Sequence, residues 1–457
     1  MNVEDKKILV VGFARSGLSA ANFLLKRGAR VTITDTKSEE DLKDWIAQLS
    51  KPTTLSLGGH IREDFLGADF IVLSPGVPSN LPELLTASER KIPIYSEIEL
   101  AYRFLDGKFI GVSGSNGKTT TTTLIGELLK SSGHDCVVAG NIGLPLIQWV
   151  DTAPRSTSRQ RTFVVELSSF QLESIEKFKC DIALLLNVSP DHQDRYEKFA
   201  DYLHAKEQIF LNQTSEDFAV LNADNPFTLK MASHRTAPVV LYSRKQDLKE
   251  GVFVHNGSIQ VNWGGQQQRL MPISEIRLKG KHNLENMLAA TAAGFLWGVD
   301  REVMIETFRT FAGLEHRLEL VRELQGVAFY NDSKATNMDS ASQALQAFTE
   351  PLLVIMGGKD KGADFGVLRP WIAEKVKLLV LLGAASDKIS QSLGSIVATR
   401  RAKDMKQAVE LAYENALPGD TVLLSPGCTS FDMFDDFEHR GRVFKEMVNQ
   451  LAETKEI

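Results

Sequence analysis

The chain has 457 residues, 43% hydrophobic and 24% charged, which is the composition of a globular protein rather than of a disordered or fibrous one. At roughly 150 residues per domain, this length predicts about three domains. The formal net charge is -6 and no basic cluster is present, which argues against a nucleic-acid-binding face; no apolar run approaches the roughly 20 residues that span a membrane.

The first apolar run, in "MNVEDKKILVVGF", is followed at once by glycine, so it lacks the hydrophobic region of a signal peptide. Cys136, Cys180 and Cys428 are odd in number and show no metal-ligand spacing. These features predict a reduced, cytoplasmic setting without a membrane span.

Residues 1–96 alternate β-branched runs with helical patterns, which is typical of a parallel α/β sheet. "RVTITD" ends in Asp35, about 20 residues after a glycine turn, where a dinucleotide-binding unit has its ribose-binding acid. The fingerprint is incomplete, because Ala14 replaces the middle glycine between Gly12 and Gly17. Its methyl group would hinder the close approach of a pyrophosphate, which argues against NAD.

Two strands of the chain are followed by the same turn sequence. "DFIVLSPGVPS" includes Ser74, Pro75 and Gly76, and "DTVLLSPGCTS" repeats the pattern near the C-terminus. Pro-Gly favours turns in general, so the likeness indicates either convergent turns or two related nucleotide-fold domains with loops over a shared cleft. The sequence leaves both interpretations open.

Residues 97–312 form the predicted central domain, with strands in "FIGVSG", "TFVVELS", "CDIALLLNVS", "FAVLN" and "VVLYS". "GVFVHNGSIQVNWGGQQQRLMP" predicts short antiparallel strands around an Asn-Gly turn. Residues 313–457 again alternate strands and helices. We therefore expect three α/β domains: a Rossmann-like N-terminal domain, a central mononucleotide-binding parallel sheet of the P-loop type with a small antiparallel sheet, and a Rossmann-like C-terminal domain.

"GVSGSNGKTTTTTLI" predicts a phosphate-binding loop, although Val112 stands where the usual pattern has its first glycine. The strand leads into a helix N-terminus, where backbone N–H groups and the helix dipole favour phosphate. Lys118 adds a positive charge, and Thr119 is placed to bind magnesium. The candidate ATP-binding residues of this segment are Gly114, Ser115, Asn116, Gly117, Lys118, Thr119 and Thr120.

Two later strands end near candidate metal ligands, Glu166 and His192. Because the carboxyl ends of parallel strands meet at one edge of a sheet, we expect Lys118, Glu166 and His192 to converge on one site. Thr119, Glu166 and His192 are suitable ligands for magnesium beside a triphosphate.

Lys206 lies on the apolar face of the predicted helix in "EKFADYLHAKEQIFL" and therefore points inward. Burial of an ammonium group is costly. Either the long stem reaches solvent, or Lys206 has a depressed pKa and reacts with carbon dioxide to give a carbamate that binds a second metal ion.

Asn283 and Asn286 lie one helical turn apart, so they either contact an adenine or act as a cap and a surface residue. Arg317 stands at the second domain boundary, where an arginine can reach a γ-phosphate, and Asp332 follows a buried strand. Lysine, hydroxyl and aromatic groups after strands of the third domain suit a small anionic substrate. These residues are Thr336, Lys361, Ser430, Phe431 and Phe437.

In this order, "GSNGKTT", "NIGLP", "ELSSFQLE", "NVSPDHQDRY", "HAK", "KGKHNLEN", "GLEHRLE", "NDSKATN", "GGKDKGAD" and "LLSPGCTSFDMFDDFEHRG" resemble the Mur ligases of peptidoglycan synthesis over essentially the whole chain. The phosphate loop alone is shared with folylpolyglutamate synthases. "NDSKATN" and "SPGCTSFDMF" together resemble most the family members that add D-glutamate.

The resemblance implies an ATP-dependent amide ligase that joins D-glutamate to UDP-N-acetylmuramoyl-L-alanine through an acyl phosphate and a tetrahedral intermediate. It implies two magnesium ions, one on Thr119 and Glu166 and one on His192 and carbamylated Lys206. Asn283, Asn286, Arg317 and Asp332 would contact ATP, and the third-domain residues above would bind D-glutamate. The UDP-substrate positions would be Arg15, Ser16, Asp35, Thr36, Ser74, Pro75, Gly76 and Asn141. We expect a monomer.

Two positions depart from the family pattern: Phe431 replaces a common leucine and Arg15 replaces an apolar residue. Among alternative functions, a folylpolyglutamate synthase-like ligase would lack a UDP-binding first domain. A non-ligating, ATP-driven switch would hydrolyse ATP without any amino acid. A nicotinamide dehydrogenase conflicts with Ala14 and with the second phosphate loop.

Overall fold

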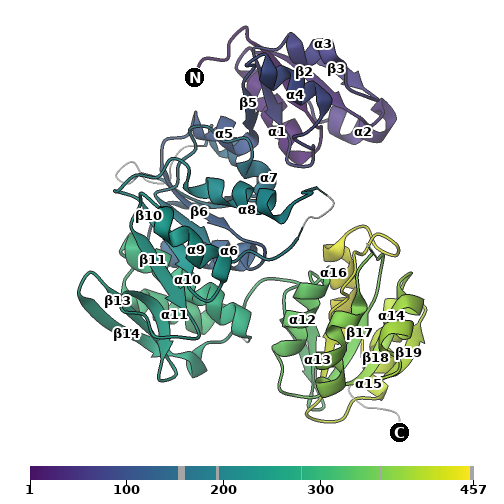
Figure 1. The fold of residues 1–457 in the computed structure, drawn as a ribbon. Coiled ribbons are helices and arrows are strands. Elements are labelled where there is room, and N and C mark those ends of the chain that lie inside the picture. Colours follow the sequence, from purple (N-terminus) through teal and green to yellow (C-terminus); the bar gives the residue numbers. More distant parts are fainter. Residues whose placement is uncertain (153–159, 192–194, 279, 361, 453–457) are drawn as a thin grey trace. The chain divides into compact units, whose positions relative to one another are not determined.

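The computed structural model describes residues 1–152, 160–191, 195–278, 280–360 and 362–452 (Figure 1). The chain divides into two compact units, Met1–Ser274 with Glu285–Thr307 and Glu275–Leu284 with Phe308–Ile457. Sheets of five and nine strands belong to the first unit, and a sheet of six strands belongs to the second. This organisation confirms the predicted α/β class, while the boundaries after residues 96 and 312 remain predictions.

The first sheet is parallel, in the order β3-β2-β1-β4-β5. Because the strand order reverses at β1, the carboxyl ends of β1 and β4 flank a crevice of the kind that binds ligands in such sheets. Its strands are β1 (Lys7–Val11), β2 (Arg30–Asp35), β3 (Thr54–Leu57), β4 (Phe70–Leu73) and β5 (Ile94–Ser96). Its helices are α1 (Arg15–Lys26), α2 (Glu39–Ile46), α3 (Arg62–Leu66) and α4 (Pro82–Glu89).

The second sheet has the order β14-β13-β12-β11-β10-β9-β6-β8-β7. It is parallel from β12 to β7, and β12 and β13 form the predicted hairpin around Asn256 and Gly257. Its strands are β6 (Lys108–Ser113), β7 (Cys136–Gly140), β8 (Thr162–Glu166), β9 (Ile182–Leu185), β10 (Phe218–Asn222), β11 (Val239–Ser243), β12 (Gly251–His255), β13 (Ser258–Trp263) and β14 (Gln266–Pro272).

Eleven helices and helical turns of the described residues accompany the second sheet in the chain. They are α5 (Glu97–Tyr102), α6 (Lys118–Ser131), η1 (Leu146–Trp149), α7 (Ser169–Leu172), α8 (Phe199–Glu207), η2 (Gln208–Phe210), α9 (Pro226–Met231), η3 (Ala232–His234), η4 (Ile273–Glu275), α10 (Lys281–Trp297) and α11 (Arg301–Thr310). The phosphate loop lies between β6 and α6, as the sequence predicts.

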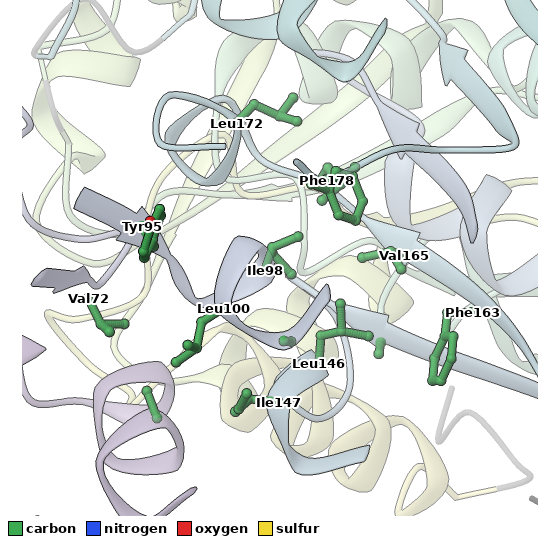
Figure 2. Close-up of a cluster of buried hydrophobic side chains, with 14 of the residues drawn as sticks. Val72, Tyr95, Ile98, Leu100, Leu146, Ile147, Phe163, Val165, Leu172 and Phe178 are labelled. Atoms are coloured by element: carbon green, nitrogen blue, oxygen red, sulfur yellow. The ribbon is translucent and has the colours of Figure 1, made fainter. Parts of the chain in front are cut away.

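The first two sheets share one hydrophobic core, in which Val72 of β4 and Ile98 of α5 lie in the same cluster as Leu146 of η1 (Figure 2). Glu97 is buried at the start of α5 and accepts a hydrogen bond from Ile147 N at 2.6 Å. Burial raises the pKa of the Glu97 carboxyl to about 7. The short helix η1 is thus tied to α5 by apolar packing and by a buried carboxyl group.

The third sheet has the order β15-β16-β20-β17-β18-β19 and is parallel except for the β15–β16 pair. Its strands are β15 (Glu319–Leu324), β16 (Val327–Asn331), β17 (Leu352–Met356), β18 (Val376–Leu382), β19 (Ala398–Ala402) and β20 (Thr421–Leu424). Its helices are α12 (Met338–Gln346), η5 (Phe365–Leu368), α13 (Arg369–Lys375), α14 (Ser386–Leu393), α15 (Met405–Glu414) and α16 (Phe437–Asn449).

The three cysteines are free thiols and all are buried. Burial raises the pKa of the Cys136 and Cys428 thiols to about 12 and raises that of Cys180 as well. Within the described residues, no helix has the length and apolar character needed to cross a membrane.

Candidate active site

All eight candidate UDP-substrate residues line one cavity of about 550 Å³ in the first unit. The cavity lies at the carboxyl ends of β1, β2 and β4, and residues from the segment after β7 complete its wall. The eight residues are Arg15, Ser16, Asp35, Thr36, Ser74, Pro75, Gly76 and Asn141. A concave site at a reversal of strand order is the usual position of a nucleotide ligand in such sheets.

Hydrogen bonds to the backbone fix the shape of this cavity. The Asp35 carboxylate accepts from Phe13 N at 2.7 Å and from Lys37 N at 2.9 Å, and Ser74 Oγ donates to Gly12 O at 2.7 Å. Asp35 therefore braces the glycine turn in addition to lining the cavity. The Arg15 guanidinium donates to Gly143 O, which links the cavity rim to the segment before η1.

Among the other residues that line the cavity, three carry polar side chains that the sequence analysis did not single out, namely Lys37, His60 and Gln171. His60 Nδ1 lies 2.9 Å from the buried Thr34 Oγ1. Gln171 forms a capping box with Ser168 at the start of α7. The S-x-x-Q pattern of "SSFQ" predicts that capping box, but no pattern in the sequence indicates His60.

The phosphate loop turns at Gly117, the N-cap of α6, where φ is 84° and a non-glycine residue would be strained. Lys118 Nζ donates to Gly114 O and to Ser115 O, both at 2.8 Å. Asn187, after β9, pairs with the loop: its Oδ1 accepts from Asn116 N at 2.8 Å. The lysine and the helix N-terminus thus lie together, as a phosphate site requires.

Glu166 ends β8 and is 3% exposed. Its Oε1 accepts from Asn141 Nδ2 at 2.8 Å, while its Oε2 is buried and has no hydrogen-bond partner among the described residues. A buried carboxylate oxygen without a partner is costly, and a bound cation would satisfy it. Asn141, expected to contact the substrate, therefore also orients the candidate metal ligand.

Lys206, in α8, is 2% exposed, so the predicted inward orientation is confirmed. Its Nζ donates to Gly114 O at 2.8 Å, the same oxygen that accepts from Lys118. Burial, reinforced by the charge of Lys118, holds the pKa of Lys206 well below its ordinary value. His192, the other expected ligand, lies outside the described residues.

Asn283 and Asn286 both belong to α10, and both residues are buried. The alternative interpretation, a helix cap and a surface residue, is therefore wrong. A Cβ built on Gly117 would lie 2.2 Å from Asn286 Oδ1, so this amide packs directly against the phosphate loop.

In the second unit, Asp332 follows β16 and is buried, and its Oδ1 accepts from Leu318 N at 3.2 Å. Burial raises the pKa of this carboxyl to about 7, and the nearby Arg317 opposes the shift. The sequence-predicted Asp332 and Arg317 are thus electrostatic neighbours.

The candidates for the small anionic substrate differ in exposure. Ser430 is buried, Thr336 is half-buried, and Phe431 is 65% exposed. Phe437 is the first residue of α16, and Lys334 Nζ lies 3.6 Å from the centroid of its ring. Lys361 lies outside the described residues.

Family models match the chain in three consecutive segments. They are described as "Mur ligase MurD-like, N-terminal domain" over residues 6–96, "Mur ligase middle domain" over residues 112–294 and "Mur ligase, glutamate ligase domain" over residues 316–428. The three segments follow the order expected from the sequence.

Curated relatives match almost the full chain. The UDP-N-acetylmuramoylalanine--D-glutamate ligases of Geotalea uraniireducens and Acidobacterium capsulatum are each 46% identical over 452 residues, covering 99% and 98% of this chain and 99% and 97% of their own. Among solved structures, the UDP-N-acetylmuramate-alanine ligase MurC of Thermotoga maritima has a TM-score of 0.60 at 18% identity, covering 97% of this chain and 99% of its own. That structural likeness concerns the fold alone.

Proposed function

The chain belongs to the Mur ligase family, and we propose that it joins D-glutamate to UDP-N-acetylmuramoyl-L-alanine, converting ATP to ADP and phosphate, in the synthesis of peptidoglycan precursors. The observation that carries this proposal is the presence, on either side of the phosphate loop, of the MurD-like N-terminal domain and the glutamate ligase domain. Identity of 43% to 46% with D-glutamate ligases, over 98% to 99% of this chain, supports the same substrates.

The reaction must first activate a carboxylate, which is a poor electrophile. We propose that Lys118 and the backbone N–H groups at the start of α6 hold the ATP phosphates while the alanine carboxylate attacks the γ-phosphorus. ADP leaves, and the amine of D-glutamate then attacks the acyl phosphate. The tetrahedral intermediate expels phosphate and leaves an amide bond, so one ATP is consumed for each bond formed.

We propose that one magnesium ion is held by Thr119 and Glu166. The unpartnered, buried Oε2 of Glu166 fits such an ion, and Asn141 fixes the other carboxylate oxygen. When bound, magnesium neutralises the charge that develops on the transferred phosphoryl group. With Asn141 donating to Oε1 and a cation on Oε2, Glu166 would serve as a ligand rather than as a general base.

We propose that Lys206 is carbamylated and, with His192, holds a second magnesium ion. Two ammonium groups on the single acceptor Gly114 O would repel one another, which favours a neutral amine at Lys206. The neutral nitrogen forms a bond to the carbon of carbon dioxide and releases one proton, giving a carbamate anion. An intact-mass increase of one carbon dioxide on native protein, lost on Lys206→Ala substitution, tests this step.

Substrate contacts follow from the cavity and from the third domain. We propose that the eight candidate UDP-substrate residues, all of which line the cavity, hold the uridine nucleotide, and that Thr336, Lys361, Ser430, Phe431 and Phe437 hold D-glutamate. Asn283, Asn286, Arg317 and Asp332 are proposed to contact ATP. The cavity takes half a dinucleotide, which agrees with the incomplete dinucleotide fingerprint at Ala14.

Phosphate release from ATP tests the whole proposal, measured with UDP-N-acetylmuramoyl-L-alanine and with D-glutamate, L-glutamate, L-lysine or no amino acid. We expect sustained release only with D-glutamate. Release that does not depend on any amino acid would support the ATP-driven switch instead. The folylpolyglutamate synthase-like alternative is disfavoured by residues 6–96, which match the domain that such an enzyme lacks.

A further inference from the structure

Arg195 bridges the wall of the cavity and the segment that follows β8. Its Nη1 donates to Pro75 O at 3.2 Å, and Pro75 lines the cavity. Its Nη2 donates to Glu173 Oε2 at 3.1 Å, and its guanidinium carbon lies 4.2 Å from the ring centroid of Phe170. The Arg195 side chain is 12% exposed, so these contacts hold it in one position.

A chain of contacts continues from this arginine to the phosphate loop. Tyr196 donates its hydroxyl hydrogen to Glu173 Oε1 and stacks on Phe170 at 5.9 Å between ring centroids. The Tyr196 ring also lies 5.3 Å from that of Tyr202, whose hydroxyl is 3.0 Å from Ser115 Oγ. Ser115 belongs to the phosphate loop. Every member of this chain of contacts lies within the first unit.

The segment that Arg195 contacts also belongs to both sites. Glu166, the last residue of β8, is the candidate metal ligand, and Gln171, one turn further on, lines the cavity. A shift of this segment would therefore change the cavity wall and the phosphate site together.

Arg27 is a natural control for Arg195. It donates to Asp151 at 2.6 Å and lies 3.8 Å from the ring centroid of Phe23, so it combines an ion pair with an aromatic contact in the same way. It also links a helix of the first sheet to the chain after η1. Neither Arg27 nor its two partners line the cavity.

We propose that Arg195 is a positioning residue that couples the cavity to the phosphate loop, so that a ligand in one site strengthens binding in the other. The inference rests on the proposed function insofar as the cavity takes a uridine nucleotide and the loop takes ATP. A ligand in the cavity fixes the Pro75 turn and, through Arg195, the aromatic side chains beside the loop. The second ligand then loses less conformational freedom on binding, and the effect is reciprocal.

Calorimetric titration of the full-length protein with magnesium and AMP-PCP, a non-hydrolysable ATP analogue, tests the coupling in the presence and absence of saturating UDP. UDP fills the nucleotide cavity but has no muramoyl-alanine group to reach the phosphates. In the parent protein and in Arg27→Met we expect UDP to lower the Kd of the analogue about fivefold or more. In Arg195→Met we expect a change below about twofold, although UDP still binds.

Arg195→Lys is the second variant, because an ammonium group can hold one of the two acceptors but lacks the planar fork that reaches both. Its coupling should lie between those of the parent and Arg195→Met. Undiminished coupling in both Arg195 variants would overturn the proposal, and so would UDP binding to the parent without any effect on the analogue. Absence of UDP binding to the parent would contradict the proposed function of the cavity and the coupling with it.

Discussion

The tripeptide Ser-Pro-Gly follows a buried parallel strand twice, after β4 and after β20, and the two turns differ in their exposure to solvent. The first turn, residues 74–76, lines the cavity, and its glycine is exposed. In the second turn, residues 425–427, all three residues are buried. The same turn sequence can therefore form part of a cavity wall or lie buried in the interior, and the surrounding chain decides which.

An arginine lies beside each turn: Arg195 donates to Pro75 O within the first, and Arg440 donates to Cys428 O, the residue that follows the second. Arg195 at the first turn is paired with the Glu173 carboxylate. Arg440 at the second turn is 2% exposed and donates to Ser333 Oγ, Ser333 O and Cys428 O, none of which is a carboxylate. Burial lowers the pKa of Arg440 to about 10.

Replacing the two arginines gives the largest expected contrast. Arg440→Met would leave three buried acceptors without their charged donor and should cost the third sheet about 3 to 5 kcal/mol. Arg195→Met breaks an ion pair whose side chains are 12% and 14% exposed, and it should cost less, about 1.5 to 3 kcal/mol. Hydrogen exchange of the β20 and β4 amides in the full chain measures each effect locally. Equal losses at the two strands would show that both turns are structural supports.

The second turn lies beside a buried acid, since Asp332 N donates to Leu424 O. The pKa of Asp332 is raised from 3.8 to about 7, so between these values the folded protein keeps a proton that the unfolded chain has lost. The free energy of unfolding therefore falls as pH rises through this window, by at most about 4 kcal/mol. The raised pKa of Glu97 lowers the free energy of unfolding over the same pH range. The contribution of Asp332 must therefore be measured as the difference between the parent protein and a variant that lacks this carboxyl.

Urea unfolding of the parent and of Asp332→Asn between pH 4 and pH 8 isolates the Asp332 contribution. The amide keeps an oxygen for Leu318 N but does not ionise, so the parent should lose stability relative to the variant as pH rises. A difference that stays constant with pH would mean that the Asp332 carboxyl is already ionised in the folded protein.

The glycines of the two turns test the comparison directly. Gly427 has a φ of 64°, and a Cβ there would lie 2.6 Å from the flexible end of Met338, so Gly427→Ala should cost about 1 to 2 kcal/mol. Gly76→Ala meets nothing within 4 Å and should change stability by less than about 0.5 kcal/mol. We expect Gly76→Ala instead to weaken UDP binding, measured by calorimetry; unchanged UDP affinity would argue that this turn does not contact the ligand.

The serines give the smallest expected effects. Ser74 Oγ donates to Gly12 O, so Ser74→Ala should cost about 1 kcal/mol. Ser425 Oγ is buried with no hydrogen-bond partner among the described residues, so Ser425→Ala should leave stability unchanged or raise it slightly. Thermal unfolding of the two variants, measured side by side, checks the order. A larger loss for Ser425→Ala would reveal an acceptor that the static structure does not show.

The sequence could predict the features that depend on local pattern. Apolar runs located the strands that end at Ser113 and Glu166, glycine and lysine located the phosphate loop, and helical spacing placed Lys206 inside. These predictions succeed because strand period, helix period and turn preference act over a few residues. The family resemblance supplied the eight positions that line one cavity.

Features that depend on distant partners could not be predicted in this way. The edge strands β15 and β19 carry charged residues among their apolar ones and are for the most part not buried, so they lack the apolar run that marks a buried strand. Nothing in "LSPG" distinguishes the open turn from the buried one, because the neighbours of each turn come from elsewhere in the chain: a Cβ on Gly427 would meet Met338, whereas a Cβ on Gly76 would meet nothing within 4 Å. His60 lines the cavity and contacts Thr34, and no local sequence pattern predicts that contact.

The burial of all three thiols makes it practical to label this protein at one introduced cysteine. With Cys136, Cys180 and Cys428 buried and their thiol pKa values raised, alkylating dyes should react slowly with the native chain. A cysteine introduced as Gly76→Cys would stand exposed at the mouth of the cavity. A single fluorophore attached there would report binding and release of the proposed uridine nucleotide in real time, against an otherwise unlabelled background.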